Sequence, residues 1–377
     1  MLDAGHNNAG NEMTSSRRRA WLWGLVALVA AALLFGAYAI YWQQVAKRLQ
    51  AGVEEWAGDQ RSAGATVDFK WNGISGFPFA FTADFTGVNI LGRLGGTALS
   101  ARTDHLQLNM SPIDLNRVRL LCDSPLTVII PGLSLGQPGA GTGDAPATGT
   151  RLTLDQADGS ILLRNGNPAG ATIDVNRGKL DNGQTVLSAA SLHIDVQLPP
   201  TPPHDFKDPA AMFNIAASNV DLPADMPQLL PGPITQADIT GTIKGPLLPP
   251  GAPPPADLAS ALSQWSTPGG DIELSRFDYA QGPVTMTGSG TLALDQNLQP
   301  VGAGTITATG LGDLIDLLAA RGAIHHKDAG IAKAVIQGLE KPGATGRPEV
   351  TVGLTIQDRV VSFGFAKLFK LPPINWP

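Results

Sequence analysis

The chain has 377 residues, a net charge of −6, and only 15% charged residues. Its acidic balance disfavours nucleic-acid binding, which requires clustered basic side chains to contact phosphates. The single cysteine excludes an intrachain disulfide and a zinc cluster built on thiolates. With 44 glycines and 30 prolines, the composition favours many short strands and turns over long soluble helices.

Residues 20–42 form an uncharged apolar stretch near the N-terminus. As a helix this stretch would extend about 35 Å, enough to cross a hydrocarbon core of about 30 Å. Aromatic residues that favour the headgroup level lie at its two ends: Trp21 and Trp23 at one, and Tyr38, Tyr41 and Trp42 at the other. A cleaved secretion signal would have a shorter apolar region of about 7–15 residues. We therefore predict an uncleaved transmembrane anchor.

The basic residues that flank the span predict its orientation. Arg17, Arg18 and Arg19 directly precede it and add to the charge of the amino terminus, although Lys47, Arg48 and Arg61 follow it. A long trailing region is translocated largely regardless of its own charge. We expect a single-pass protein of the inner (plasma) membrane, with residues 1–19 in the cytoplasm and the bulk of the chain in the periplasm.

The hydrophobic period changes after the span. Residues 43–63 carry one apolar stripe at helical spacing, which predicts a juxtamembrane helix. From residue 64 the apolar residues alternate with polar ones, as in half-buried antiparallel strands. The strictest alternation is in residues 67–71, 77–85, 186–198, 284–294 and 350–356. Weaker strand patterns are in residues 88–91, 97–110, 117–130, 151–155, 160–164, 171–176, 211–222, 234–243, 271–279, 301–309 and 359–366.

The predicted fold is mainly β, with one or more large curved antiparallel sheets and a few short helices. Helical patterns cover residues 256–265, 312–320 and 328–339. Loops rich in Gly or Pro cover residues 131–150, 199–209 and 245–255. The loop at 199–209 separates an N-terminal β region, 64–198, from a C-terminal β region, 210–377. The pattern does not decide whether the two regions form one sheet or two domains.

The stretch KWNGISGFPFAF, residues 70–81, is unusually aromatic for a chain with 6% aromatic residues. Asn-Gly is a strong hairpin signal, Gly also permits a sharp bend, and Pro cannot donate to a central strand. We predict a hairpin that docks its aromatic face near the juxtamembrane helix; a simple core nucleus is the alternative. Its residues are Trp71, Asn72, Gly73, Gly76, Phe77, Pro78 and Phe79.

The chain shows no catalytic signature. Residues 132–136 match the nucleophile-elbow pattern at Ser134, but a loop rich in Gly and Pro follows where that motif needs a helix. The His325–His326 pair has no metal-ligand spacing, and Cys122 lacks neighbouring groups that would activate its thiol. We predict no enzymatic activity, no catalytic residue, no metal and no cofactor.

The apolar sides of the strands suggest a binding surface. Glycine and alanine on these sides leave room for a ligand or, alternatively, mark sheet curvature. One interpretation is an open groove for lipid or another amphiphile, and the other is a closed, dry core. The predicted lining consists of Val284, Met286, Leu292, Leu294, Ile306 and Ala308.

Several turn and strand-end motifs carry a family resemblance. They include WNGISGFPF at 71–79, QGP at 281–283, GSGTLALD at 288–295 and LPP at 371–373. The chain resembles an uncharacterised proteobacterial family, the domain of unknown function numbered 2125, over most of its length. More distantly, it is similar to AsmA-like envelope proteins. That second resemblance implies a role in lipid transport or outer-membrane biogenesis, by analogy only.

Two functions remain open at this point. The first is a membrane-anchored periplasmic protein, without enzymatic activity, that binds or carries lipid or another amphiphile in cell-envelope biogenesis. The second is a structural or scaffolding envelope protein with a closed β core, whose sheet edges recruit protein partners.

Overall fold

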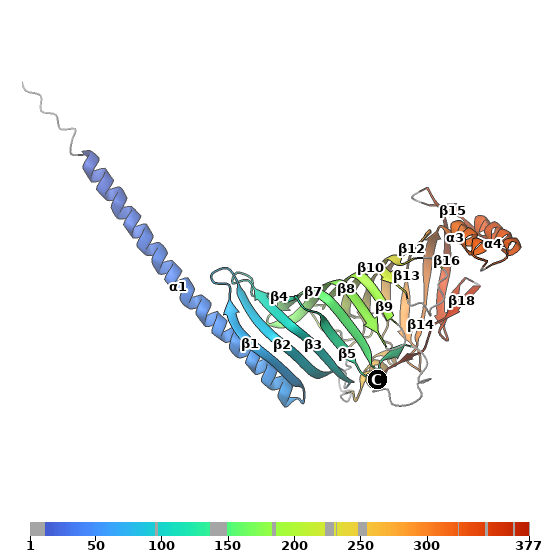
Figure 1. Ribbon diagram of the computed structural model, residues 1–377, viewed down its shortest axis with the longest axis horizontal. Coiled ribbons are helices and arrows are strands. Elements are labelled where there is room, and N and C mark those ends of the chain that lie inside the picture. The colour runs from blue at the N-terminus through green and yellow to red at the C-terminus, as the bar shows by residue number, and fades with distance from the viewer. Residues whose placement is uncertain are drawn as a thin grey trace, which may run out of the picture.

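The computed structural model describes residues 12–94, 97–135, 149–182, 186–222, 230, 232–247, 255–322, 324–343, 346–364 and 366–376. A long N-terminal helix is followed by a wide antiparallel sheet, with two short helices at its far end (Figure 1). The helices are α1 (Glu12–Ser62), α2 (Leu258–Ser266), α3 (Leu311–Ala320) and α4 (His326–Leu339).

The first strands are β1 (Thr66–Ser75), β2 (Phe81–Leu94), β3 (Thr97–Met110), β4 (Arg117–Cys122), β5 (Leu126–Ile130), β6 (Ser134–Leu135), β7 (Thr150–Arg164), β8 (Asn167–Asp181) and β9 (Val186–Gln197). The others are β10 (Pro209–Asp221), β11 (Ile234–Lys244), β12 (Ile272–Gln281), β13 (Val284–Leu294), β14 (Pro300–Thr309), β15 (Lys341–Pro342), β16 (Pro348–Gln357), β17 (Val360–Phe363), β18 (Ala366–Lys370) and β19 (Ile374–Asn375).

Seventeen of these strands form one antiparallel sheet, and β6 and β19 form a separate pair. Neighbours in the sheet are mostly neighbours in sequence, so the sheet is a meander from β1 to β18. Strand β9 pairs directly with β10 along nearly its whole length. The Pro-rich segment 199–209 is therefore a connection within one sheet, and the regions 64–198 and 210–377 share that sheet.

Most predicted strands and all three predicted short helices are present, with shifted boundaries. Residues 151–155 and 160–164 belong to one strand, β7, whereas 117–130 splits into β4 and β5. The expected turn at Asn72–Gly73 is wrong, because β1 continues through these residues with an irregularity between Trp71 and Gly73. The β1–β2 turn instead spans residues 76–80, where Gly76 has a φ of 97°. There the amides of Phe79 and Ala80 both donate to the Gly76 carbonyl.

Helix α1 is continuous through the predicted span and the predicted juxtamembrane helix. From Leu28 to Ser62 it contains a window that is long and apolar enough to cross a membrane, and none of that window is buried. The last turns of α1 pack against the edge strand β1, where Ala57 and Val67 are almost fully buried. The Arg61 guanidinium donates to the Val67 carbonyl, with Nε at 3.0 Å. This end of α1 therefore covers a sheet edge that would otherwise be open to pairing.

The sheet twists enough to bring distant segments together. The amide of Leu258, at the start of α2, donates to Thr97 Oγ1 of β3 at 2.9 Å. Ser134 of β6 pairs with Asn375 of β19, near the C-terminus. Strands near the beginning of the meander are thereby linked to its last third, consistent with the right-handed twist that accumulates over many strands.

Four glycines show that the sheet bends toward its apolar side. Gly288 and Gly290 of β13 pair with Ile306 and Gly304 of β14, and Gly302 follows on the same face. A Cβ on any of these glycines would lie 2.4–2.6 Å from a carbonyl oxygen of the paired strand. The strands approach too closely on this side for a side chain. Of the two interpretations of these glycines, sheet curvature and room for a ligand, the close approach of the strands therefore favours curvature.

We predict that Gly304→Ala destabilises the protein, because its Cβ would lie 2.4 Å from the Ser289 carbonyl. Overpacking of this kind costs about 1–3 kcal/mol. Gly353→Ala is the control: its Cβ would be 3.9 Å from the nearest atom, on the exposed side of β16. This control should be neutral or stabilising by up to about 1 kcal/mol. Denaturant unfolding of the full chain in detergent measures both, and equal stability of the two variants would refute the curvature interpretation.

Candidate functional site

One apolar row crosses the sheet from β1 to β16. Residues in direct register on neighbouring strands share a face, so the pairing defines the row without reference to side-chain rotamers. In order across the sheet, the members are Ile74, Ala83, Leu108, Leu120, Gly159, Ile173, Ile194, Ile215, Ile239, Phe277, Gly288, Ile306 and Val352. Every position is apolar or glycine, and the row passes through thirteen strands.

The middle of this apolar row is neither buried nor freely exposed. Leu120, Ile194, Ile215 and Ile239 are half-buried, and Ile173 is 37% exposed. A strand core sealed by a second layer would bury such aliphatic side chains almost completely. The row therefore forms a long apolar surface that remains partly accessible to solvent.

The six residues predicted to line a groove lie on this same face of β13 and β14. Met286 pairs with Ala308, while Leu292 and Leu294 pair with Gly302 and Pro300. Three of the six are buried, namely Val284, Ile306 and Ala308, and the other three are half-buried, namely Met286, Leu292 and Leu294. The structure thus brings all six to one face but leaves only part of the set accessible.

One buried part of this face lies where α3 and α4 pack. Val284, the first residue of β13, and Ala308, near the end of β14, are each 1% exposed. Val350, near the start of β16, is 3% exposed. Helix α3 packs near β13 and helix α4 near β16. Gly310, with φ 74°, makes the sharp entry into α3. The helix pair is therefore well placed to close one end of the apolar face, away from α1 (Figure 1).

The opposite face of the sheet is lined by hydroxyl groups. Hydrogen-bonded pairs cross it between neighbouring strands, including Thr285 to Thr309 at 2.6 Å and Thr307 to Thr351 at 2.9 Å. Ser191 and Ser218 form a similar pair at 2.6 Å. Such cross-strand pairs stabilise a solvated face and leave the other side as the apolar one.

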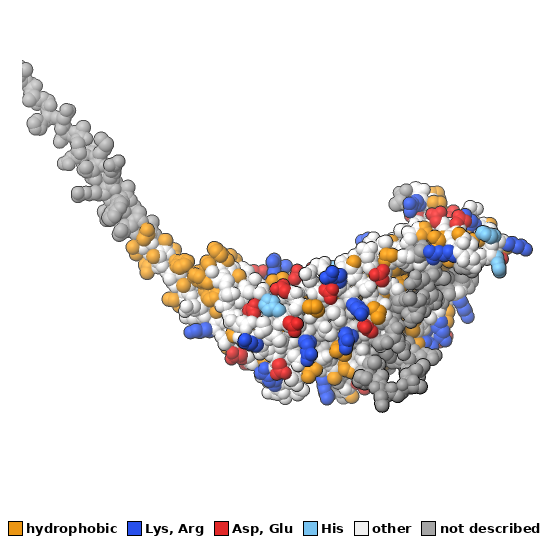
Figure 2. All heavy atoms as spheres, in the orientation of Figure 1, with side chains coloured by type: hydrophobic (Ala, Val, Ile, Leu, Met, Phe, Trp, Pro, Cys, Tyr) orange, Lys and Arg blue, Asp and Glu red, His pale blue; other side chains and the backbone are white. Residues whose placement is uncertain are grey.

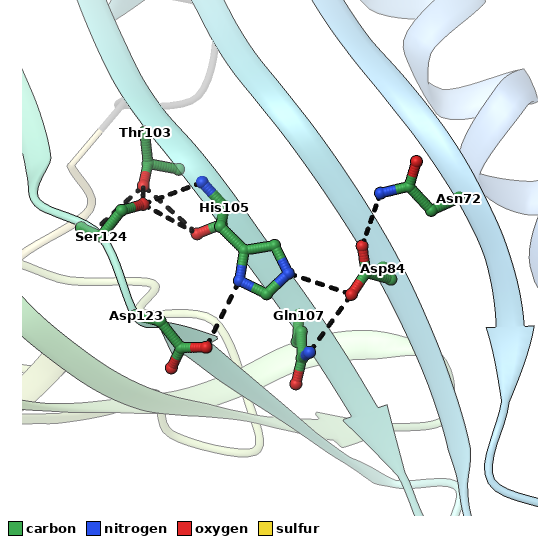
Figure 3. A network of polar contacts seen from close by, with 7 residues as sticks. All are labelled: Asn72, Asp84, Thr103, His105, Gln107, Asp123 and Ser124. Atoms are coloured by element: carbon green, nitrogen blue, oxygen red, sulfur yellow. Dashed lines mark hydrogen bonds and ion pairs between the residues drawn. The ribbon is translucent and has the colours of Figure 1, made fainter.

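A cluster of polar residues on β1 to β5 is the second candidate site (Figure 3). His105 Nε2 lies 3.0 Å from Asp84 Oδ2, and His105 Nδ1 lies 3.3 Å from Asp123 Oδ2. Asn72 and Gln107 also donate to Asp84. The hydrogen bonds from Asn72 and then His105 lower the pKa of Asp84, and the bond to Asp84 raises the pKa of His105.

The contacts of this cluster stabilise the gap between β4 and β5. Strands β4 and β5 both pair with β3 and β7, with a gap between them at residues 123–125. Ser124 Oγ accepts from the His105 amide at 2.8 Å and contacts Thr103 Oγ1 at 2.9 Å. Both ring nitrogens of His105 already face carboxylates, so neither is placed to activate the Ser124 hydroxyl.

The other residues singled out by sequence have ordinary surroundings. Cys122 is 6% exposed in a cluster with Leu154, Ala157 and Val175, and burial raises the pKa of its thiol, which disfavours the reactive thiolate. Ser134 lies in β6, whereas residues 136–148, where a nucleophile elbow needs its helix, lie outside the described residues. His325 and His326 begin α4. Within the described ranges, no group of three or more His, Cys, Asp or Glu residues could hold a metal.

Comparison with protein families now adds to this geometry. Residues 42–372 match the model of a family described as "Uncharacterized protein conserved in bacteria (DUF2125)". The chain belongs to this family. No curated protein and no solved structure matches the chain. The DUF2125 match includes the whole sheet up to β18, and the more distant resemblance to AsmA-like proteins stays a prediction.

We predict that Asp84→Asn weakens the fold in a pH-dependent way. The raised pKa of His105 contributes stability that is fully present below the unfolded pKa of about 6.5 and is lost as pH rises through the folded value. The lowered pKa of Asp84 contributes stability that is present above about pH 3.9 and is lost as pH falls further. The pair is therefore most stabilising between about pH 4 and 6.5.

Because the two groups are partly exposed, the expected cost of Asp84→Asn at pH 5.5 is about 0.5–1 kcal/mol, decreasing at pH 8.5. Denaturant unfolding at the two pH values measures this cost. The control is Asp174→Asn, which removes the carboxylate that pairs with His193. The Asp174 side chain is more exposed than that of Asp84, so this substitution should cost less stability. A cost for Asp84→Asn that is the same at both pH values would argue against the ion pair.

Proposed function

We propose that this DUF2125 protein is a membrane-anchored periplasmic protein without enzymatic activity, which binds lipid or another amphiphile along its apolar row. The observation that carries the proposal is the partly accessible row that passes from β1 to β16. Large aliphatic side chains left half-exposed on adjacent strands are unfavourable in water at about 25 cal/mol per Å². A bound acyl chain would remove this surface from solvent.

The location of the row supports a lipid as the ligand. The row begins at Ile74 of β1, the strand against which α1 packs, and α1 contains the candidate span. Apolar binding surfaces recognise a ligand chiefly by shape and by removal of water, with few polar groups to fix its orientation. The apolar surface therefore suits an acyl chain better than a polar metabolite.

The sequence supports the proposed anchoring and orientation. Arg17, Arg18 and Arg19 precede the span and predict a cytoplasmic N-terminus, so the sheet would lie in the periplasm. Alkaline-phosphatase and fluorescent-protein fusions to the C-terminus distinguish the two orientations, because the phosphatase is active only after export.

Met286→Arg tests the lipid proposal. Met286 is half-buried on the apolar face, and Thr287→Arg introduces the same charge on the exposed opposite face. We expect native mass spectrometry of the full chain, purified from membranes in detergent, to show bound lipid for the parent and for Thr287→Arg. Met286→Arg should lose most of this lipid, since a charge in contact with an acyl chain is costly.

A second variant guards against misfolding. Ile173→Glu changes a member of the apolar row that is already 37% exposed, so the fold should tolerate it. We expect its free energy of unfolding to stay within about 0.5 kcal/mol of the parent's, as is usual for surface positions. Its lipid occupancy should decrease. A parent protein without bound lipid, or equal occupancy in Met286→Arg and Thr287→Arg, would contradict lipid binding on this face.

A scaffolding role is the second candidate, because Val284, Ile306 and Ala308 are buried as in a closed core. On that model the apolar face is dry packing, and partners bind at the edges or on the hydroxyl face. Met286→Arg would then unfold the protein, the parent would carry no lipid, and a crosslinker placed at Thr287 would capture a protein partner.

A further inference from the structure

The β1–β2 turn is a compact apolar element beside α1. Residues 71–83, WNGISGFPFAFTA, contain no charged side chain, and the turn itself spans residues 76–80. The space-filling view shows hydrophobic side chains gathered along α1 and where it meets the first strands (Figure 2). This surface is continuous with the apolar stretch of α1 predicted to cross the membrane.

The turn is fixed to α1 at the aromatic end of the predicted span. Tyr38 donates its hydroxyl to the Pro78 carbonyl, and Trp42 Nε1 donates to the Ala80 carbonyl at 3.1 Å. The Phe77 ring makes edge contacts with Phe35 at 5.7 Å and with Trp42 at 5.5 Å between ring centroids. These contacts place the turn at the level of α1 where the sequence pattern predicts the membrane surface.

The tip of the turn presents aromatic side chains to the surroundings. Phe79 is 86% exposed and Phe77 is 41% exposed, although other aromatic residues of this region are buried, such as Phe81 at 2%. Phe81 stacks on Trp42 at 5.2 Å, so the region has an aromatic core that Phe79 does not join. Local packing therefore accounts for Phe81 and leaves Phe79 without an explanation.

The backbone of the turn is suited to a medium that offers few hydrogen-bond partners. The amides of Phe79 and Ala80 donate to the Gly76 carbonyl, at 3.0 and 2.9 Å. Pro78 has no amide hydrogen, and the carbonyls of Pro78 and Ala80 accept from the two α1 side chains. An apolar turn with these groups paired can enter the headgroup region at a low desolvation cost.

We propose that the β1–β2 turn is a second membrane contact, in which Phe79, supported by Phe77, inserts into the headgroup–acyl boundary of the bilayer that α1 crosses. This inference rests on the membrane anchoring of the proposed function and is independent of lipid binding on the sheet. The contact would fix the rotation of α1 about its axis and hold the β1 end of the sheet at the membrane surface.

Nitroxide depth measurements test the proposal on the full chain, reconstituted into vesicles of phosphatidylethanolamine and phosphatidylglycerol. The single native cysteine is replaced by Cys122→Ala, whose unfolding midpoint is checked first. Labels are attached through Phe79→Cys, through Leu34→Cys in the span, and through Gln296→Cys in an exposed turn distant in sequence. Collision rates with oxygen and with a water-soluble nickel reagent then report the depth of each label.

We expect the label at position 34 to be deep, the label at 296 to be fully accessible to nickel, and the label at 79 to have a several-fold lower nickel collision rate than at 296. A label at exposed Ser75, introduced as Ser75→Cys, keeps Phe79 in place. Its protection from nickel should decrease when Phe79→Ser is added, while the unfolding midpoint stays unchanged.

The outcomes separate this inference from the anchoring itself. If position 34 is deep but positions 79 and 296 are equally accessible, the protein is anchored and the turn does not touch the bilayer. If position 34 is also accessible, the anchor and the inference both fail. If protection at position 79 persists in detergent micelles without a bilayer and depends on protein concentration, a second copy covers Phe79, and the membrane contact is refuted.

Discussion

The structure depends on a period-two alternation that stays in register through twelve successive strand pairings. Every direct pair along the row joins two apolar positions or an apolar position and a glycine, from Ile74 to Val352. A one-residue slip at any strand would turn all its apolar side chains toward the hydroxyl face, which makes each register strongly specified. The same alternation therefore determines the sheet's pairing, its two chemically different faces, and the candidate binding surface.

Three places in such a sheet need specific residues: the open edge at β1, the gap between β4 and β5, and the bend at β13 and β14. Helix α1 covers the β1 edge, with Arg61 bonded to the Val67 carbonyl. Ser124 supplies an acceptor for the His105 amide where β4 and β5 leave a gap. The glycines of β13 and β14 allow the strands to bend toward the apolar side without clashes. These devices explain particular polar residues and glycines that a simple alternation pattern does not predict.

Alternation predicted most strands and the composition of each face, because period two is a local property of sequence. It could not predict register: Ile173 and Ile239 lie in weakly patterned segments, and their places in the row depend on pairing with neighbours. It also led to a wrong position for the first turn, at Asn72–Gly73. Glycine is common both in hairpin turns and in β-bulges, and here Gly73 lies at an irregularity within β1. The His105 cluster joins residues 72, 84, 105 and 123, whose separation in sequence gives no recognisable spacing.

The proposed membrane contact and the apolar row lie next to each other in the chain. Ile74, the first member of the row, lies two residues before the turn that carries Phe79. A turn held at the headgroup level would place this end of the row close to the acyl region of the bilayer. At the far end, α3 and α4 pack near Val284 and Val350, where the face is buried. An amphiphile that entered the row from this end would meet half-buried positions at Ile74 and Ala83, a partly accessible middle that includes Ile173, and a closed end near α4. On the proposed function, the middle strands are therefore where its apolar portion would be withdrawn from water.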